Sequence, residues 1–158
     1  MASCLNNLGE VARQQGDFKR AKEHHQASRQ IREEIGNRIG IAYSNNNLGD
    51  VLLAMGQNEE AYAHYRQAAR QAMEVEAAPA VIYILAGIAR WHAKQKNWEQ
   101  AAQLLGFLQA SAHGQDVEDR LQRLLTRLEK QVPKKELSAW RQQGQKSTLD
   151  NWIEVPQV

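Results

Sequence analysis

The sequence predicts an all-α fold in which three helix pairs stack as a solenoid and further helices cap the C-terminal end. The first observation is a repeat: residues 6–11 read Asn-Asn-Leu-Gly-Glu-Val, and residues 46–51 read Asn-Asn-Leu-Gly-Asp-Val. A more diverged copy, Ala-Gly-Ile-Ala-Arg-Trp, fills residues 86–91. Self-similarity at a fixed period is the signature of stacked repeats. The second observation is composition, because only three prolines and ten glycines interrupt 158 residues, so long helices are possible nearly everywhere.

The first repeat is predicted over residues 2–37. A helix over 2–15 carries apolar residues at three- and four-residue spacing, and a second helix covers about 18–35. Between them, Gly16 ends the first helix and Asp17 caps the second, since its carboxylate can accept from free amides of the first turn. A turn this short makes the two helices antiparallel neighbours.

The second and third repeats, residues 38–77 and 78–113, follow the same order. In the second, Gly56 takes the place of Gly16 and the second helix covers about 59–76. In the third, Pro79 fits the first turn of a helix, where its missing N–H has no intrahelical partner. Small residues recur at matching positions in all three repeats and let paired helices approach closely. These positions are Gly9, Gly49 and Ala89, and Ala21, Ala61 and Ala101.

The remaining residues, 115–158, are predicted to cap the solenoid, because a stack of repeats exposes an apolar end that must be covered. One helix is expected over 117–131, a shorter one from Pro133 that ends at Gly144, and a last turn or short helix over 148–153. The first repeat has no comparable cap before residue 2, which suggests that the chain is a part of a longer protein.

These patterns resemble the tetratricopeptide (TPR) repeat in its 40-residue form, where Asn-Asn-Leu-Gly is typical, as in kinesin light chains and sensor regions of bacterial signal-transduction ATPases. The residues that carry the resemblance are Leu8, Gly9, Gly16 and Ala21, with their counterparts 40 and 80 positions later. The third repeat departs from the pattern at Gly87 and Lys96. The resemblance covers about residues 2–112 and implies a right-handed TPR-like solenoid whose concave face binds a peptide.

A narrower resemblance concerns residues 98–106, Trp-Glu-Gln-Ala-Ala-Gln-Leu-Leu-Gly, and the helical tail after them. The segment is similar to the C-terminal end of large bacterial regulators, of the STAND and LuxR types, that join an ATPase module to TPR repeats. Residues 140–144 and 149–150 stand about where such a tail places similar residues. This resemblance implies the sensor or partner-binding end of a signalling or transcription regulator.

The predicted ligand is a protein or peptide segment in the groove lined by the first helix of each pair. An asparagine side chain both donates and accepts hydrogen bonds, so a ladder of asparagines suits the backbone of an extended peptide. The alternative is that these asparagines only bond neighbouring helices or water. Acidic groove residues argue against a ligand with an acidic tail. The predicted groove residues are Asn6, Asn7, Glu10, Arg13, Tyr43, Asn46, Asn47, Asp50, Tyr83, Arg90 and Lys94.

Other classes of function find little support in the sequence. Three histidines, His24, His25 and His64, have no set of cysteines or carboxylates at ligand spacing, so no metal, cofactor or catalytic site is expected. The formal net charge of +2 gives little reason to expect nucleic acid. The lone Cys4, the absence of a signal peptide and the lack of an apolar run of spanning length predict a cytoplasmic protein that does not enter membranes.

Two non-enzymatic functions therefore lead, and an enzyme or a nucleic-acid-binding helical repeat is a remote alternative. The first is partner capture in the groove, as the sensor end of a larger regulator. The second is structural, namely self-association or docking through the exposed edge of the N-terminal repeat.

Overall fold

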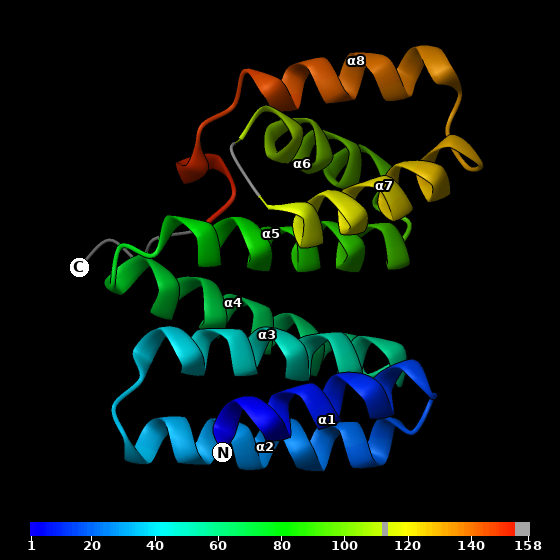
Figure 1. Ribbon diagram of the computed structural model, residues 1–158. Coiled ribbons are helices and arrows are strands. Elements are labelled where there is room, and N and C mark those ends of the chain that lie inside the picture. The colour runs from blue at the N-terminus through cyan, green and yellow to red at the C-terminus, as the bar shows by residue number, and fades with distance from the viewer. Residues whose placement is uncertain (112–113, 154–158) are drawn as a thin grey trace. The chain divides into compact units, whose positions relative to one another are not determined.

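A computed structural model describes residues 1–111 and 114–153 (Figure 1), so the predicted ends of the third repeat and of the cap lie partly outside the described residues. Every regular element within this part of the chain is a helix, and the predicted all-α fold of successive helix pairs is confirmed. None of these helices is long and apolar enough to cross a membrane. The helices are α1 (Ala2–Gln14), α2 (Phe18–Glu34), α3 (Arg38–Ala54), α4 (Asn58–Glu74), α5 (Ala78–Lys94), α6 (Trp98–Ala110), α7 (Gln115–Glu129), α8 (Lys134–Gln145) and the short 3-10 helix η1 (Leu149–Asn151).

The helices from α1 to α6 are joined by turns of one design. In the first turn the amide of Gly16 donates to the Arg13 carbonyl at 3.1 Å, and the amide of Asp17 donates to the Ala12 carbonyl at 2.9 Å. This pair of bonds closes a helix end in a Schellman motif, which needs a residue with positive φ. Both bonds recur in the four later turns. The residues with positive φ are Gly16, Gly36, Gly56, Glu76 and Lys96, spaced by 20 positions.

The turns before and after α5 keep this backbone although neither has a glycine at the position with positive φ. Lys96 has φ 63° and Glu76 has φ 52°, close to the values of the glycines at the equivalent positions. A side chain at positive φ costs roughly 1–2 kcal/mol, because Cβ crowds the following carbonyl. The helix packing on either side of these turns therefore holds two strained residues in place.

The chain forms two compact units, Met1–Ile84 and the residues from Leu85 onward, and α5 contributes to both. In the first unit α1 packs on α2, α2 on α3 and α3 on α4, so helices that follow one another in sequence are also neighbours in space (Figure 1). The buried positions include Ala21 and Ala61, which are both fully buried. This matches the prediction of close helix approach at small residues.

Inside each pair of the first unit, a glycine of one helix accommodates a ring from the other. A Cβ added to Gly9 would lie 2.7 Å from His25 Cε1, and a Cβ added to Gly49 would lie 2.8 Å from Tyr65 Cε1. Both rings are fully buried. The glycine in the repeated Leu-Gly motif thus makes room for a ring 16 residues further along the chain.

The same pair of positions in the second unit holds Ala89 and Leu105, which are both fully buried. The repeat that has alanine at the first of these positions has an aliphatic residue at the second, and the two repeats that have glycine there have a ring.

In the second unit α6 packs on α8, and two glycines bring the backbones of these helices together. A Cβ on Gly106 would overlap the backbone of Arg141, and a Cβ on Gly144 would overlap the backbone carbonyl of Gln103. The expectation that Gly144 ends the helix is wrong, because α8 continues to Gln145. Gly144 is there for close approach and not for a turn.

The predicted last turn over 148–153 contains η1. Trp152, which follows it, lies against Phe107 of α6 with ring centroids 6.3 Å apart. The indole Nε1 of Trp152 also donates to the Ser147 hydroxyl at 2.9 Å. The aromatic contact thus holds the tail of the second unit onto α6, and the hydrogen bond joins two residues of the tail to each other.

We expect the Lys96→Gly substitution to stabilise the protein by about 0.5–1 kcal/mol, because the strain at positive φ exceeds the entropic cost of glycine. Urea unfolding measures the change. The control is Gln26→Gly at an exposed position in the middle of α2, which should destabilise by about 1 kcal/mol, since glycine is unfavourable inside a helix. Equal effects of the two substitutions would contradict the strain.

We expect the Gly144→Ala substitution to destabilise the protein by about 3 kcal/mol, although alanine favours helices, because the added methyl group meets the backbone of α6 and no rotamer relieves the overlap. Thermal unfolding followed by circular dichroism measures the loss. Gly114→Ala is the control, because the Cβ there meets only the Asp116 side chain, at 3.1 Å. A neutral Gly144→Ala variant would contradict the close crossing.

Candidate functional site

The predicted groove residues all lie on the first helices of the pairs. Those on α1 and α3, together with Tyr83, belong to the first unit, whereas Arg90 and Lys94 belong to the second. The groove residues of the first unit, from α1 to Tyr83, define the candidate site.

A chain of asparagine side chains connects α1 to α3. Asn47 Nδ2 donates to Asn6 Oδ1 at 2.8 Å, and Asn46 Nδ2 donates to Asn47 Oδ1 at 3.3 Å. Asn46 is fully buried and Asn47 nearly so, while Asn6 is half-buried and Asn7 exposed. Within the described residues, the Asn6 side-chain NH₂ group has no hydrogen-bond partner. The amides accessible to a ligand are thus those of Asn6 and Asn7, and Asn47 positions Asn6.

Sequence reasoning missed Asn45, which joins three helices of the first unit. Its Nδ2 donates to Gln71 Oε1 of α4 at 2.8 Å, and its Oδ1 accepts from Arg29 Nη1 of α2 at 3.3 Å. The same oxygen lies 3.3 Å from His64 Nδ1. Asn45 is fully buried. The available signal was that the equivalent positions in the other repeats hold leucine, at Leu5 and Leu85.

Glu10 and Arg13 of α1 form a two-pronged ion pair. Arg13 Nη2 lies 2.6 Å from one carboxylate oxygen of Glu10, and Arg13 Nε donates to the other at 2.9 Å. Partial burial raises the pKa of Glu10, but hydrogen bonds from Arg13 and Gln14 outweigh it, so the pKa is lowered. Glu10 is therefore ionised at neutral pH, and the pair offers a ligand both signs of charge.

Asp50 occupies the position equivalent to Glu10 but is 1% exposed. Its Oδ1 accepts a hydrogen bond of 2.6 Å from the hydroxyl of Tyr65. A buried carboxylate needs such donors, because removal from water is costly. This contact gives Asp50 a part in joining α3 to α4.

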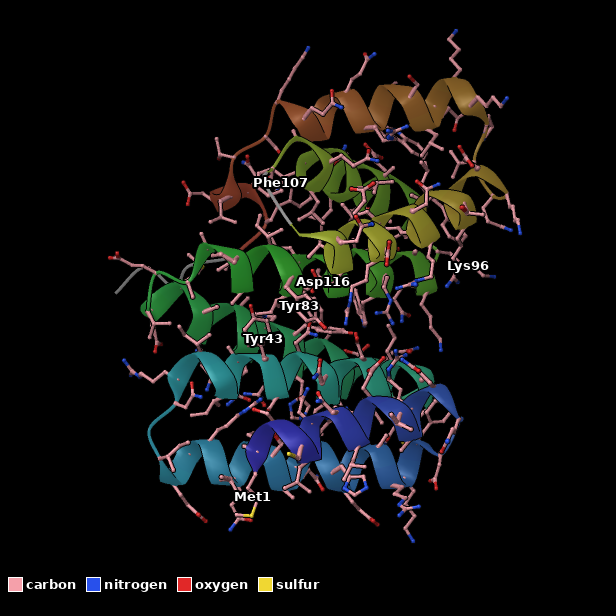
Figure 2. All side chains as sticks on the ribbon, in the orientation of Figure 1. Met1, Tyr43, Tyr83, Lys96, Phe107 and Asp116 are labelled. Atoms are coloured by element: carbon pink, nitrogen blue, oxygen red, sulfur yellow. The ribbon has the colours of Figure 1, made fainter. Side chains whose placement is uncertain are left out.

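The predicted groove residues Tyr43 and Tyr83 come together in the first unit. Their ring centroids lie 5.4 Å apart with an interplanar angle of 69°, an edge-to-face contact, and Figure 2 shows the two side chains close to one another. Both residues are half-buried. Such a pair adds about 0.5–1.5 kcal/mol beyond its buried area and presents a rigid aromatic surface.

His25 differs from its equivalent, Tyr65, in having no polar partner. The residue is fully buried, and neither ring nitrogen has a hydrogen-bond partner among the described residues. Burial lowers the pKa of His25 to about 4, although Glu10 and Asp50 act in the opposite direction. The imidazole is therefore neutral at pH 7.

The histidines do not gather into a metal site in the part of the chain that the structure describes, where no three His, Cys, Asp or Glu side chains could hold an ion. His64 Nδ1 lies 3.3 Å from Asn45 Oδ1, and burial lowers the pKa of His64.

The comparisons with known proteins agree with the repeat geometry. The family model for the tetratricopeptide repeat matches residues 1–70 and, in a second overlapping match, residues 38–106. Together the matches cover residues 1–106 of the 158 in the chain. A comparison with curated proteins found no match.

The buried His25 predicts a stability that depends on pH. Its pKa is about 4 in the folded chain and 6.5 when unfolded. Between these values the unfolded chain binds more protons, so the free energy of unfolding falls as the pH drops from 6.5 to 4, by about 3 kcal/mol at most. The titratable and charged groups whose electric field acts on the His25 ring are Glu10, Asp50, Arg13 and His24.

Urea unfolding at several pH values measures this dependence. We expect His25→Leu to flatten it, while the half-buried neighbour substitution His24→Leu leaves it in place. Because His64 and His92 are present in both variants, these two histidines cannot account for a difference between the two pH profiles. The same slope in both variants would contradict the assignment.

Proposed function

This chain belongs to the tetratricopeptide repeat family, and on that basis we propose that it captures an extended segment of a partner protein along the first helices of its pairs. Repeats of this family generally mediate protein–protein interaction and are typically non-catalytic modules. The proposal for this chain is accordingly a binding protein without an enzymatic activity of its own.

The observation that carries the proposal is the Asn47–Asn6 hydrogen bond of 2.8 Å. It occupies the oxygen of the Asn6 amide and leaves the NH₂ group to bond a ligand. The partner for two such donors, on Asn6 and Asn7, is the carbonyl of a peptide backbone, because a backbone offers acceptors in any sequence.

The neighbouring groups supply selectivity in this proposal. The Glu10–Arg13 pair offers a donor and an acceptor of opposite charge, which suits a segment of mixed charge better than an acidic tail. The half-buried ring pair of Tyr43 and Tyr83 offers an apolar surface for a side chain of the ligand. Asn46, Asn47 and Asp50 are buried, so in this proposal they position the exposed groove residues and do not contact the ligand. Arg90 and Lys94 belong to the second unit, and their part in binding stays a prediction from the sequence.

A finer proposal concerns the biological setting. The resemblance of residues 98–106 and the tail to the end of ATPase-linked regulators supports a role as the sensor or partner-binding part of a cytoplasmic signalling or transcription regulator. The reading frame that precedes the codon for Met1 tests this: an encoded ATPase module would support the setting, and an unrelated preceding gene would count against it.

We expect the double substitution Asn6→Ala and Asn7→Ala to weaken peptide binding by about 5- to 150-fold, since two hydrogen bonds contribute roughly 1–3 kcal/mol together. The probe is a peptide selected on the wild-type chain from a random phage-displayed library, and fluorescence anisotropy measures its affinity. The Asn6 change also removes the acceptor of the nearly buried Asn47 amide, so the melting temperature should fall by a few degrees, and far-UV circular dichroism at the assay temperature checks that the variant is folded.

The control for this experiment is Gln67→Ala with Arg70→Ala, two exposed positions on α4, a second helix of a pair. The control should bind the peptide like the wild type. Unchanged affinity in the Asn6, Asn7 variant, or failure of the library to yield a binder, would overturn the proposed site.

A further inference from the structure

One face of α1 presents a stripe of exposed apolar residues, which we call the α1 stripe. It consists of Met1, Cys4, Leu8 and Val11, spaced by three, four and three positions. Met1 is 86% exposed, Leu8 51% and Val11 49%, and Cys4 is also exposed. Figure 2 shows the Met1 side chain pointing away from the helices of the first unit. This spacing keeps the four side chains on one side of the helix and is the spacing of a coiled-coil seam.

On α3, one repeat later, the residues equivalent to the α1 stripe are covered by other helices. The equivalent residues of α3, namely Ser44, Leu48 and Val51, are at most 1% exposed. Val51 packs with Ala12 and Ala21 of the first repeat. The α1 stripe thus occupies the positions that serve as a helix-packing surface one repeat later.

The α1 stripe nevertheless differs from the α3 surface in chemistry. On α3, Ser44 accepts from Arg32 Nη1 at 2.8 Å and Asn45 accepts from Arg29, so polar residues receive the arginines of α2. At the equivalent positions α1 has Cys4 and Leu5, which behave as apolar side chains. A helix like α2 would leave its arginines without these acceptors there. An apolar face suits the α1 stripe better.

A second α1 provides such a face. Glu10 and Arg13 are the charged residues of this helix, and they pair with each other at 2.6 Å. Two copies of the helix therefore meet without like-charge repulsion. At the other end of the chain, α6 is packed against α7 and α8, so no equivalent open helix face is described there for a head-to-tail contact. A self-complementary patch of this kind fits a closed pair with two-fold symmetry.

We propose that a second copy of this chain binds the α1 stripe, α1 against α1, and that the protein is a homodimer. The dimer contact does not involve the Asn6 amide and does not depend on the proposed peptide binding.

Sedimentation equilibrium of the full chain tests the dimer. We expect a mass of about 36 kDa, twice the 17.9 kDa of one chain, at micromolar concentrations. The double substitution Leu8→Glu and Val11→Glu should give 17.9 kDa over the same range. Its far-UV circular dichroism should match the wild type, because both positions are about half exposed in the single chain.

The matched control is Ile35→Glu with Met55→Glu, which places the same charges at two other exposed apolar positions of the first unit, 67% and 44% exposed. This control should remain dimeric. A wild-type chain that is monomeric at all concentrations, a dimer that survives the Leu8, Val11 change, or a control that dissociates equally would each overturn the proposal.

Discussion

The turn after each helix fixes the spacing on which the rest of this protein depends. A residue at positive φ stands at every twentieth position from Gly16 to Lys96, so a helix and its turn have a constant length. Residues 40 positions apart therefore return to the same face of successive first helices. This is why Tyr43 meets Tyr83, 40 positions later, and why Asn6 lies within reach of Asn47, the residue that follows its equivalent, Asn46. The constraint is strong enough that two positions keep this backbone without a glycine.

Within that frame, the pairing of a small residue with a buried side chain decides the chemistry of each pair. Tyr65 and His25 occupy equivalent positions beside Gly49 and Gly9. The longer tyrosine reaches the Asp50 carboxylate, whereas the shorter imidazole finds no partner. A buried polar group without a partner destabilises a fold. The unpaired His25 ring therefore destabilises the α1–α2 pair, whereas the Tyr65 hydroxyl of the α3–α4 pair has its hydrogen bond. Repetition of shape thus does not repeat polar interactions.

The sequence predicts the fold well because the period of 40 and the turn residues are local signals. It predicts less of the candidate site, since burial depends on which helix packs where. Asn47 and Asn7 occupy equivalent positions of the repeated motif, yet one is buried and the other exposed, because only the α3 position has a preceding repeat beside it. The hydrogen bonds of Asn45 with Arg29 and Gln71 also could not be predicted from the repeat, because the equivalent positions in the other repeats hold leucine. The prediction that Gly144 ends a helix was wrong for a related reason. A glycine near a helix end is typical of a turn, and the close packing of Gly144 on α6 depends on the tertiary structure.

The first helix illustrates how one amphipathic element can serve three surfaces. Successive residues of a helix are rotated by about 100°, so Asn6 and Leu8 lie on nearly opposite sides of α1. Gly9 faces the His25 ring of α2, Asn6 bonds α3 on the side of the candidate groove, and Leu8 belongs to the exposed stripe. A contact through the stripe therefore leaves the Asn6 amide accessible. In a two-fold pair each chain would keep the Asn6 side of its groove, whereas Asn7, next to Cys4 and Val11 around the helix, would border the contact. Two weak peptide sites on one dimer would bind a partner with two matching segments more tightly than either site alone.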